Sequence, residues 1–393
     1  MKNKKNELNY ALILPVFILC LIGLLSIYVA LFQDNKSESF IRIALLKQGI
    51  WMLLGLGIAI LFSHISPKFW WNSSPYFYFL CILLLIILLK YHNQYLYEQT
   101  GAKNWFSFAG ITFQPTEVVK IGFILILARL ATTRNLDQTI KADLFLLLKM
   151  TLSFIPLIIL LLLQNDFGTL LVFLFIYVFI IILSGISWRI LLPCISLGII
   201  LGIITLLLVT TTNGRELLSL IGFKQYQFHR IDVWLNPFID VHGTSYQISR
   251  GILAIATGGF TGKGFNVSEI FVPVRESDMI FSVIGENFGF VGSSFVIMLY
   301  FILIYQIFKI CLECNNIFFT YIGTGVVAML FFHIFENIGS NIALLPLTGI
   351  PLPFISQGGS SVLSNFMGLG LILSASKYTD KLGNTRIDYS NNN

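Results

Sequence analysis

Ten strongly apolar runs follow one another along this chain, separated by short polar segments. Each run is long enough to cross ~30 Å of hydrocarbon as a helix. The runs lie near residues 10–32, 45–64, 75–91, 114–131, 145–164, 167–187, 188–211, 281–309, 316–338 and 359–377. This pattern predicts an all-α, polytopic membrane protein with about ten transmembrane helices. An even number of spans puts both termini on one face.

The composition supports the same class of protein. Hydrophobic residues make up 56% of the 393 residues and charged residues only 11%, against roughly 25% in a soluble domain. Long uninterrupted runs argue against a transmembrane β-barrel, whose strands alternate over short segments. The first run exceeds a signal-peptide core, and no small-x-small cleavage site follows it. We therefore interpret residues 1–393 as a single transmembrane domain with a retained first span.

Lysine and arginine are divided unevenly between the two predicted faces. In short loops and at span ends, thirteen lie on the face of both termini and six on the opposite face. Cytoplasmic loops carry the excess of basic residues in membrane proteins. We therefore expect both termini in the cytoplasm and one large extracytoplasmic loop at about residues 212–280.

Four carboxylates fall at span ends on the predicted outer face: Glu117, Asp166, Asp278 and Glu336. Inserting an ionisable side chain into the membrane costs roughly 2.5–3.5 kcal/mol of free energy. Each such residue therefore indicates a structural or functional role. The inner loops show no comparable cluster. The pattern predicts an extracytoplasmic chemical site in which a carboxylate acts as general base.

Glu117 and Lys120 are three residues apart, a spacing that puts them on one helix face within pairing distance. Two interpretations remain open. The pair can hold a charge ready for a substrate, or it can only lock two helices together.

The polar segment Gly349–Ser361 lies between two apolar runs and contains two prolines and three glycines. Irregular backbone at membrane depth is tolerated only where it is buried in protein or lines a cavity. This segment, which ends with Ser360 and Ser361, therefore indicates a shaped polar site.

Two patterns stand out in the predicted loop. Residues 223–240, FKQYQFHRIDVWLNPFID, suit an amphipathic helix in the headgroup layer and equally an ordinary interfacial loop. The stretch ATGGFTGKGF is similar to a phosphate-binding loop, but Thr257 stands where the Walker pattern requires glycine. No nucleotide site is predicted.

Several long motifs, in the right order, resemble the SEDS family of shape, elongation, division and sporulation proteins, which includes RodA, FtsW and SpoVE. The motifs are GAKNWFSFAGITFQPTEVVK (101–120), QNDFGT (164–169), GTSYQISRGILAIATGGFTGKG (243–264), FVPVRESDMIFSVIGENFGFVG (271–292) and NIGSNIALLPLTGIPLPFISQGGSS (337–361). The resemblance covers nearly the whole chain. It looks closer to the RodA branch than to the FtsW branch.

This resemblance implies a peptidoglycan glycosyltransferase at the outer face of the bacterial cytoplasmic membrane. Such proteins polymerise lipid II, a disaccharide-peptide on undecaprenyl pyrophosphate. A class B penicillin-binding protein crosslinks the resulting strands, and no nucleic-acid partner is implied.

The resemblance also suggests roles for individual residues. Asp278 falls on the family aspartate and can be the catalytic base. The supporting positions are Trp105, Glu117, Lys120, Asp166, Arg230, Lys263, Glu286, Ser360 and Ser361. Of these, Lys120, Lys263 or Arg230 can balance the pyrophosphate charge, as can a divalent cation such as magnesium or manganese. Trp105 offers either a stacking face for a sugar or an interfacial anchor.

The chain departs from the family pattern at Asn165, Val274, Ser340 and Gln357, where proline, glutamate, methionine and tyrosine are usual. Asp278 itself is intact. Two other functions remain alternatives to the enzyme: a flippase that transports lipid II, and a non-catalytic scaffold for penicillin-binding proteins.

The predicted topology can be tested by labelling single cysteines in intact cells with a membrane-impermeant thiol reagent. A cysteine at Ser219 or Ser268, both in the loop 212–280, should react above the background of the unmodified chain, and one at Ser390 should not. Labelling at Ser390 would contradict the span count.

Overall fold

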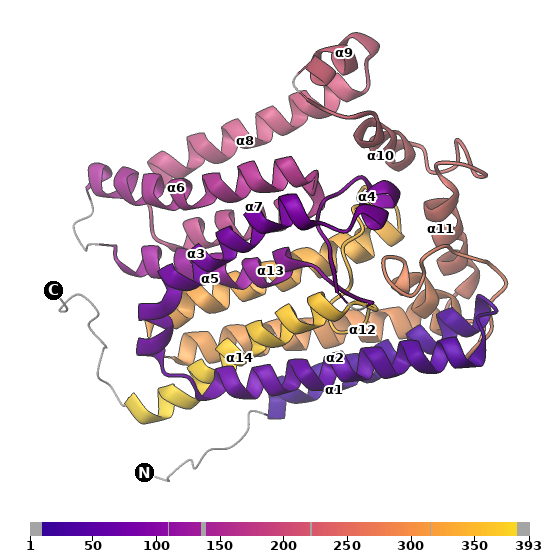
Figure 1. Cartoon of the computed structure of the whole chain (residues 1–393), viewed down its shortest axis with the longest axis horizontal. Coiled ribbons are helices and arrows are strands. Elements are labelled where there is room, and N and C mark those ends of the chain that lie inside the picture. The colour runs from indigo at the N-terminus through magenta and orange to yellow at the C-terminus, as the bar shows by residue number, and fades with distance from the viewer. Residues whose placement is uncertain (1–9, 109, 135–138, 221, 315, 383–393) are drawn as a thin grey trace.

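The computed structural model describes residues 10–108, 110–134, 139–220, 222–314 and 316–382. Ten long helices in this part of the chain form a bundle with roughly aligned axes (Figure 1). They are α1 (Tyr10–Gln33), α2 (Glu38–His64), α3 (Pro67–Tyr91), α5 (Pro115–Thr132), α6 (Ile140–Gln164), α7 (Phe167–Leu183), α8 (Trp188–Val209), α12 (Ile280–Glu313), α13 (Ile317–Asn341) and α14 (Gly359–Leu382). The labelling position Ser390 lies outside the described residues.

Each predicted span corresponds to one of these helices, so the all-α polytopic fold is confirmed. Among the described residues, eight helices are long and apolar enough to cross a membrane. Helix α7 is apolar but shorter, at 17 residues, and α5 carries Glu117, Lys120 and Arg129. Helices α2 and α3 begin earlier than predicted, because Ser37 and Ser66 cap their first turns.

Short elements gather at one end of the bundle. They are α4 (Gln94–Thr100), the antiparallel hairpin of β1 (Phe106–Phe108) and β2 (Ile111–Phe113), α9 (Thr212–Leu220), α10 (Gln225–Leu235) and α11 (Tyr246–Gly258). Figure 1 shows the short helices toward the right, whereas α14 ends toward the left. The helix expected in the aromatic stretch is present as α10. Its depth in the headgroup layer stays a prediction.

Helices α5, α13 and α14 form the centre of the bundle, and small residues allow close helix packing in membranes. On α14, a Cβ added to Gly370 would lie 2.9 Å from Cα of Ala59 on α2. By contrast, α8 lies on the outside with nearly all of its apolar surface exposed. A rigid site can therefore form at the end of these central helices that carries the short elements.

The glycine-rich loop after α11 packs backbone against backbone on the start of α12. Phe290 N donates to Gly259 O (2.9 Å), and Lys263 N donates to Glu286 O (3.0 Å). Gly289, at φ +60°, interrupts the helical geometry of α12 at this contact, a conformation that glycine adopts readily. The glycines of ATGGFTGKGF thus allow the backbone of this loop to pack closely against the backbone of α12.

The segment between α13 and α14 is irregular, as the sequence predicts, and its residues 352–356 are buried. Side chains from surrounding helices satisfy its backbone. Tyr300 OH donates to Pro353 O (2.6 Å), and Gln48 Nε2 donates to Ser356 O (3.2 Å). These carbonyl groups therefore find their hydrogen-bond donors within the protein, as irregular backbone at membrane depth requires.

Candidate active site

A cavity of about 770 Å³ opens at the end of the bundle that carries the short elements. Volumes of this size are typical of sites for small ligands. Its described lining includes Trp105, Glu117, Lys120, Asp166, Arg230, Asp278, Ser360 and Ser361. Eight of the ten residues proposed from the sequence are thus brought together from five separate stretches of the chain.

Asp278 lies two residues before α12 and is held by its backbone as well as its side chain. Its carbonyl oxygen accepts from Asn337 Nδ2 (2.9 Å) and Asn341 Nδ2 (3.0 Å), both on α13. Ser277 Oγ donates to its Oδ1 (2.9 Å). Gly349, at φ +81°, approaches so closely that an added Cβ would lie 3.3 Å from Asp278 Oδ2. The carboxylate therefore has one oriented position.

The surroundings of Asp278 raise the pKa of its carboxyl above the usual value. Burial is the largest cause, and the negative charge of Glu276 acts in the same direction. The hydrogen bond from Ser277 and the positive charge of Arg230 oppose it. A carboxylate of raised pKa accepts a proton more readily than an ordinary aspartate, which suits a general base.

Glu117 and Lys120 form a buried ion pair within a wider network. Lys120 Nζ lies 2.8 Å from Glu117 Oε2 and 2.9 Å from His333 Nε2 on α13. Ser364 Oγ on α14 donates to the same Glu117 oxygen (2.9 Å). The pair therefore joins the three central helices, in line with the locking interpretation, and at the same time lines the cavity.

Asp166 caps the N-terminus of α7, where its Oδ1 accepts from Thr169 N (3.2 Å). Its Oδ2 accepts from Asn104 Nδ2 (3.0 Å) and Gln114 Nε2 (3.4 Å). This carboxylate fixes the loop that carries Trp105 against α7. Its arrangement indicates a positioning role for Asp166.

The departure at Asn165 has a structural meaning. Asn165 ends α6 at φ +59°, a conformation that proline, the usual residue of the family pattern, cannot adopt. Its Nδ2 donates to Gly101 O (3.1 Å), and its Oδ1 accepts from Lys224 Nζ (2.7 Å) at the start of α10. The asparagine thus ties α10 to the rim of the cavity.

The remaining residues lie around the rim. Ser360 Oγ accepts from Gln114 N (2.9 Å), and Ser361 Oγ donates to Gly358 O (3.2 Å). Arg230 reaches the cavity from α10, where its charge acts on Asp278. Ser360 thus binds the backbone before α5 and Ser361 the backbone before α14, so both serines shape the wall of the cavity.

Lys263 and Glu286 differ from the sequence prediction, because neither is among the described residues that line this cavity. Lys263 Nζ lies 2.8 Å from Glu269 Oε2 and 3.7 Å from Glu286 Oε1. Arg275 lies 3.5 Å from the other Glu286 oxygen. These charges form a separate cluster that fastens the glycine-rich loop to α12, so we remove both residues from the proposed site.

Sequence reasoning counted Glu336 among the outer-face carboxylates but gave it no role, and it gave none to Gln114 or Asn104. Glu336, on α13, accepts hydrogen bonds from the backbone N–H (3.1 Å) and the hydroxyl of Thr348, which lines the cavity. Gln114 and Asn104 lie within the long motif 101–120, and this was the only feature of the sequence that could have pointed to them. The described residues contain no group of three or more His, Cys, Asp or Glu side chains placed to hold a metal ion.

Comparisons with known proteins agree with this geometry. The chain matches the cell cycle protein family model of FtsW, RodA and SpoVE over residues 10–381. It is 30% identical to a probable peptidoglycan glycosyltransferase FtsW from Enterococcus hirae over 393 residues, covering 98% of this chain and 96% of that protein.

Two solved structures have a similar fold. One is a chain of a peptidoglycan synthase complex, solved to explain how polymerization and crosslinking are coordinated, with a TM-score of 0.75 and 27% identity over 94% of this chain and 98% of that one. The other is the rod shape determining protein RodA of Thermus thermophilus, with a TM-score of 0.66 and 26% identity over 96% and 98%. Proteins named FtsW and RodA both match nearly the whole chain, so the RodA branch stays a prediction.

Breaking the buried ion pair should destabilise the protein more than removing it. We expect Lys120→Met to lower the unfolding free energy by about 3–5 kcal/mol, because it leaves Glu117 as a buried unpaired charge. Adding Glu117→Gln should restore most of this loss. Thermal unfolding in detergent measures both.

The matched control is the exposed pair of Glu38 and Arg42 on α2, where Arg42→Met should change stability by less than about 1 kcal/mol. A double variant at Glu117 and Lys120 no more stable than Lys120→Met would contradict the pairing argument.

Proposed function

Because the chain belongs to the cell cycle protein family of FtsW, RodA and SpoVE, we propose that it is a peptidoglycan glycosyltransferase acting through Asp278. Its substrate is lipid II, which it polymerises into glycan strands. The observation that carries the assignment is an oriented carboxylate of raised pKa in a cavity large enough for a sugar. It acts for cell-wall synthesis in elongation, shape or division.

Asp278 acts as the general base of an inverting transfer. Its carboxylate takes the proton of an acceptor sugar hydroxyl as that oxygen bonds to the anomeric carbon of the donor. The bond between that carbon and the pyrophosphate oxygen breaks, and its electron pair leaves with the lipid pyrophosphate. The proton remains on Asp278 until it exchanges with solvent, which the opening of the cavity allows.

Arg230 is the best-placed cation for the leaving pyrophosphate. Lys120 is fully buried and already paired with Glu117, and Lys263 belongs to the separate cluster. Arg230 is exposed at the cavity, and a guanidinium can bind phosphate oxygens through two parallel hydrogen bonds. A magnesium or manganese ion can share this task if the substrate's phosphates supply most of its ligands.

The membrane orientation and the partner follow from the same assignment. The excess of basic residues on the face of both termini favours cytoplasmic termini, and with that orientation the cavity opens at the outer face of the cytoplasmic membrane. The similar chain in a synthase complex that polymerises and crosslinks supports a class B penicillin-binding protein as partner.

The enzyme differs from the flippase and the scaffold because only the enzyme needs a base. Neither transport of lipid II nor assembly with a partner requires a proton acceptor. Polymer formation by the purified protein from lipid II therefore distinguishes the three functions.

Asp278→Asn should abolish polymerisation, because the amide cannot accept the proton, while expression in the membrane is retained. The readout is glycan polymer on a gel, from purified protein and lipid II. The control is Asp240→Asn, an exposed aspartate in the same loop outside the described cavity lining, which should leave the rate unchanged. Polymer at near the normal rate from Asp278→Asn would rule out this base.

The pH dependence should report the environment of Asp278. Burial raises its pKa, so activity should fall as the pH drops through a value above the ordinary aspartate range of about 3.9. Arg230→Gln removes a charge that lowers this pKa. The acid limb of the rate profile should therefore shift to higher pH, and Arg250→Gln, on α11 away from the cavity lining, should not shift it. A limb unmoved by Arg230→Gln would contradict the coupling.

A further inference from the structure

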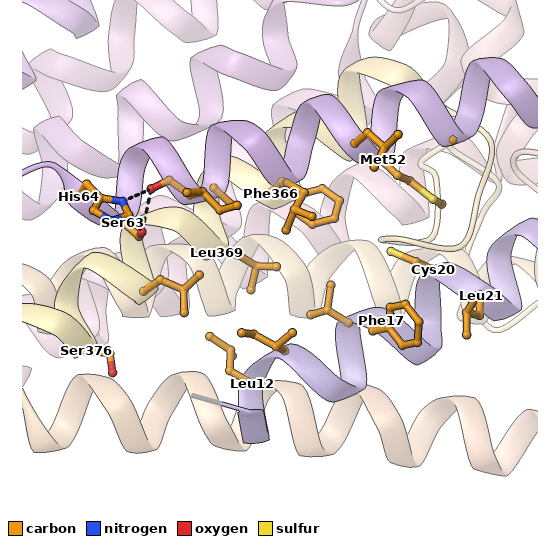
Figure 2. Close-up of a pocket in the computed structure, with 18 of the residues that line it drawn as sticks. Leu12, Phe17, Cys20, Leu21, Met52, Ser63, His64, Phe366, Leu369 and Ser376 are labelled. Carbon is orange, nitrogen blue, oxygen red and sulfur yellow. Dashed lines mark hydrogen bonds between the residues drawn. The ribbon is translucent and has the colours of Figure 1, made fainter. Parts of the chain in front are cut away.

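A second cavity of about 650 Å³ lies between α1, α2 and α14. Figure 2 shows its apolar walls, with Leu12 and Phe17 on α1, Met52 on α2, and Phe366 and Leu369 on α14. None of its described lining residues also lines the cavity of Asp278. Several of them, including Phe17 and Leu53, are strongly exposed, so this groove opens sideways toward the lipid.

Polar groups are confined to one end of the groove. Ser63 and His64 lie side by side at the left of Figure 2, Ser376 lies below them on the same side, and Cys20 and Met52 lie toward the other end. Lys377 Nζ lies 3.1 Å from Ser63 Oγ and 3.1 Å from His64 Nε2. The polar end is on the face where α2 and α14 end and α1 begins, which is the face of both termini.

The length of the groove matches one leaflet of a bilayer. Along α2 its lining runs from Gly49 to His64, which is about 22 Å at 1.5 Å per residue. Half of a bilayer, with its headgroup layer included, is about 20–22 Å thick. The groove therefore reaches from the headgroup level to about the bilayer centre, the space that one acyl chain occupies.

We propose that this groove binds one anionic phospholipid from the leaflet on the face of the termini. One acyl chain lies between α1, α2 and α14. The phosphate meets the ammonium of Lys377 beside His64, and the hydroxyl of Ser376 donates to one of its oxygens.

Charge identifies the headgroup. The described lining holds one lysine, one histidine and no aspartate or glutamate. Basic pockets between transmembrane helices on the cytoplasmic side are typical sites for anionic headgroups, and lysine serves as a compact charge for phosphate. The lining therefore favours a lipid with a net negative charge. The ammonium group of a zwitterionic lipid would find no carboxylate among the described lining residues.

The same helices connect this groove to the outer segment between α13 and α14. Gln48 is the neighbour of Gly49 on α2, and its Oε1 accepts from Gly358 N (3.2 Å). A bound chain would pack against the helix pair that anchors this segment. The lipid site does not depend on the proposed glycosyl transfer, and its tests use binding alone.

The first test removes the charge. Delipidated protein in detergent is titrated with dioleoyl phosphatidylglycerol or dioleoyl phosphatidylcholine, and bound lipid is followed by native mass spectrometry. Phosphatidylglycerol should bind more tightly, and Lys377→Gln should weaken it about fivefold. The control is Lys309→Gln, an exposed lysine on α12 outside the groove lining, with unchanged binding. Equal affinity for the two lipids, or no effect of Lys377→Gln, overturns the headgroup assignment.

The second test fills the deep end of the groove. A Cβ added to Gly49 meets no atom within 4 Å, and leucine is a better helix former than glycine. Gly49→Leu should weaken the binding of an 18-carbon phosphatidylglycerol at least fivefold and spare a 12-carbon one. Gly57→Leu, at an equally open position on α2 outside the lining, should bind both normally. Unchanged binding of the long lipid by Gly49→Leu overturns the placement of the acyl chain.

Discussion

Polar groups at membrane depth need partners within the protein, because hydrocarbon offers none. The buried segment between α13 and α14 follows from this constraint. Asn337 Nδ2 donates at once to Ile350 O in the segment and to Asp278 O before α12 (both 2.9 Å). Ser356 Oγ donates to Ser277 O (2.7 Å). The bonds that make the irregular backbone tolerable are thus the bonds that orient the carboxylate.

The same constraint separates charges that hold structure from a charge that can meet a substrate. Lys120 and Glu117 neutralise each other in the core, and the pair fixes the relative positions of α5, α13 and α14. Arg230 lies on a short helix outside the bundle, tethered at its start through Lys224 to Asn165. A charge on such an element can adjust to a large headgroup, whereas a charge locked between central helices cannot.

The amino-acid sequence predicted the spans because hydrophobic runs report the hydrocarbon layer directly. Their ends were less accurate: α2 starts at Glu38, within polar sequence, because a serine cap and not hydrophobicity begins the helix. Parity of the spans placed Glu117, Asp166, Asp278 and the segment ending at Ser361 on one face, whereas Trp105 and Arg230 were proposed only with the family resemblance. Lys263 and Glu286 lie outside the described lining of the cavity, because backbone contacts hold the loop of Lys263 against α12 at Glu286. Neither hydropathy nor the parity of the spans can predict such contacts.

The glycine contacts between the loop after α11 and α12 have a genetic consequence. A Cβ at Gly258 would collide with Gly285 O, one at Gly262 with Asn287 O, and one at Gly289 with Gly262 N. A clash with a side chain can be relieved by a second mutation that trims the neighbour. Here each neighbouring atom belongs to the main chain, which no codon change can shorten. Suppressor screens at these three positions should therefore recover true revertants and few second-site rescues.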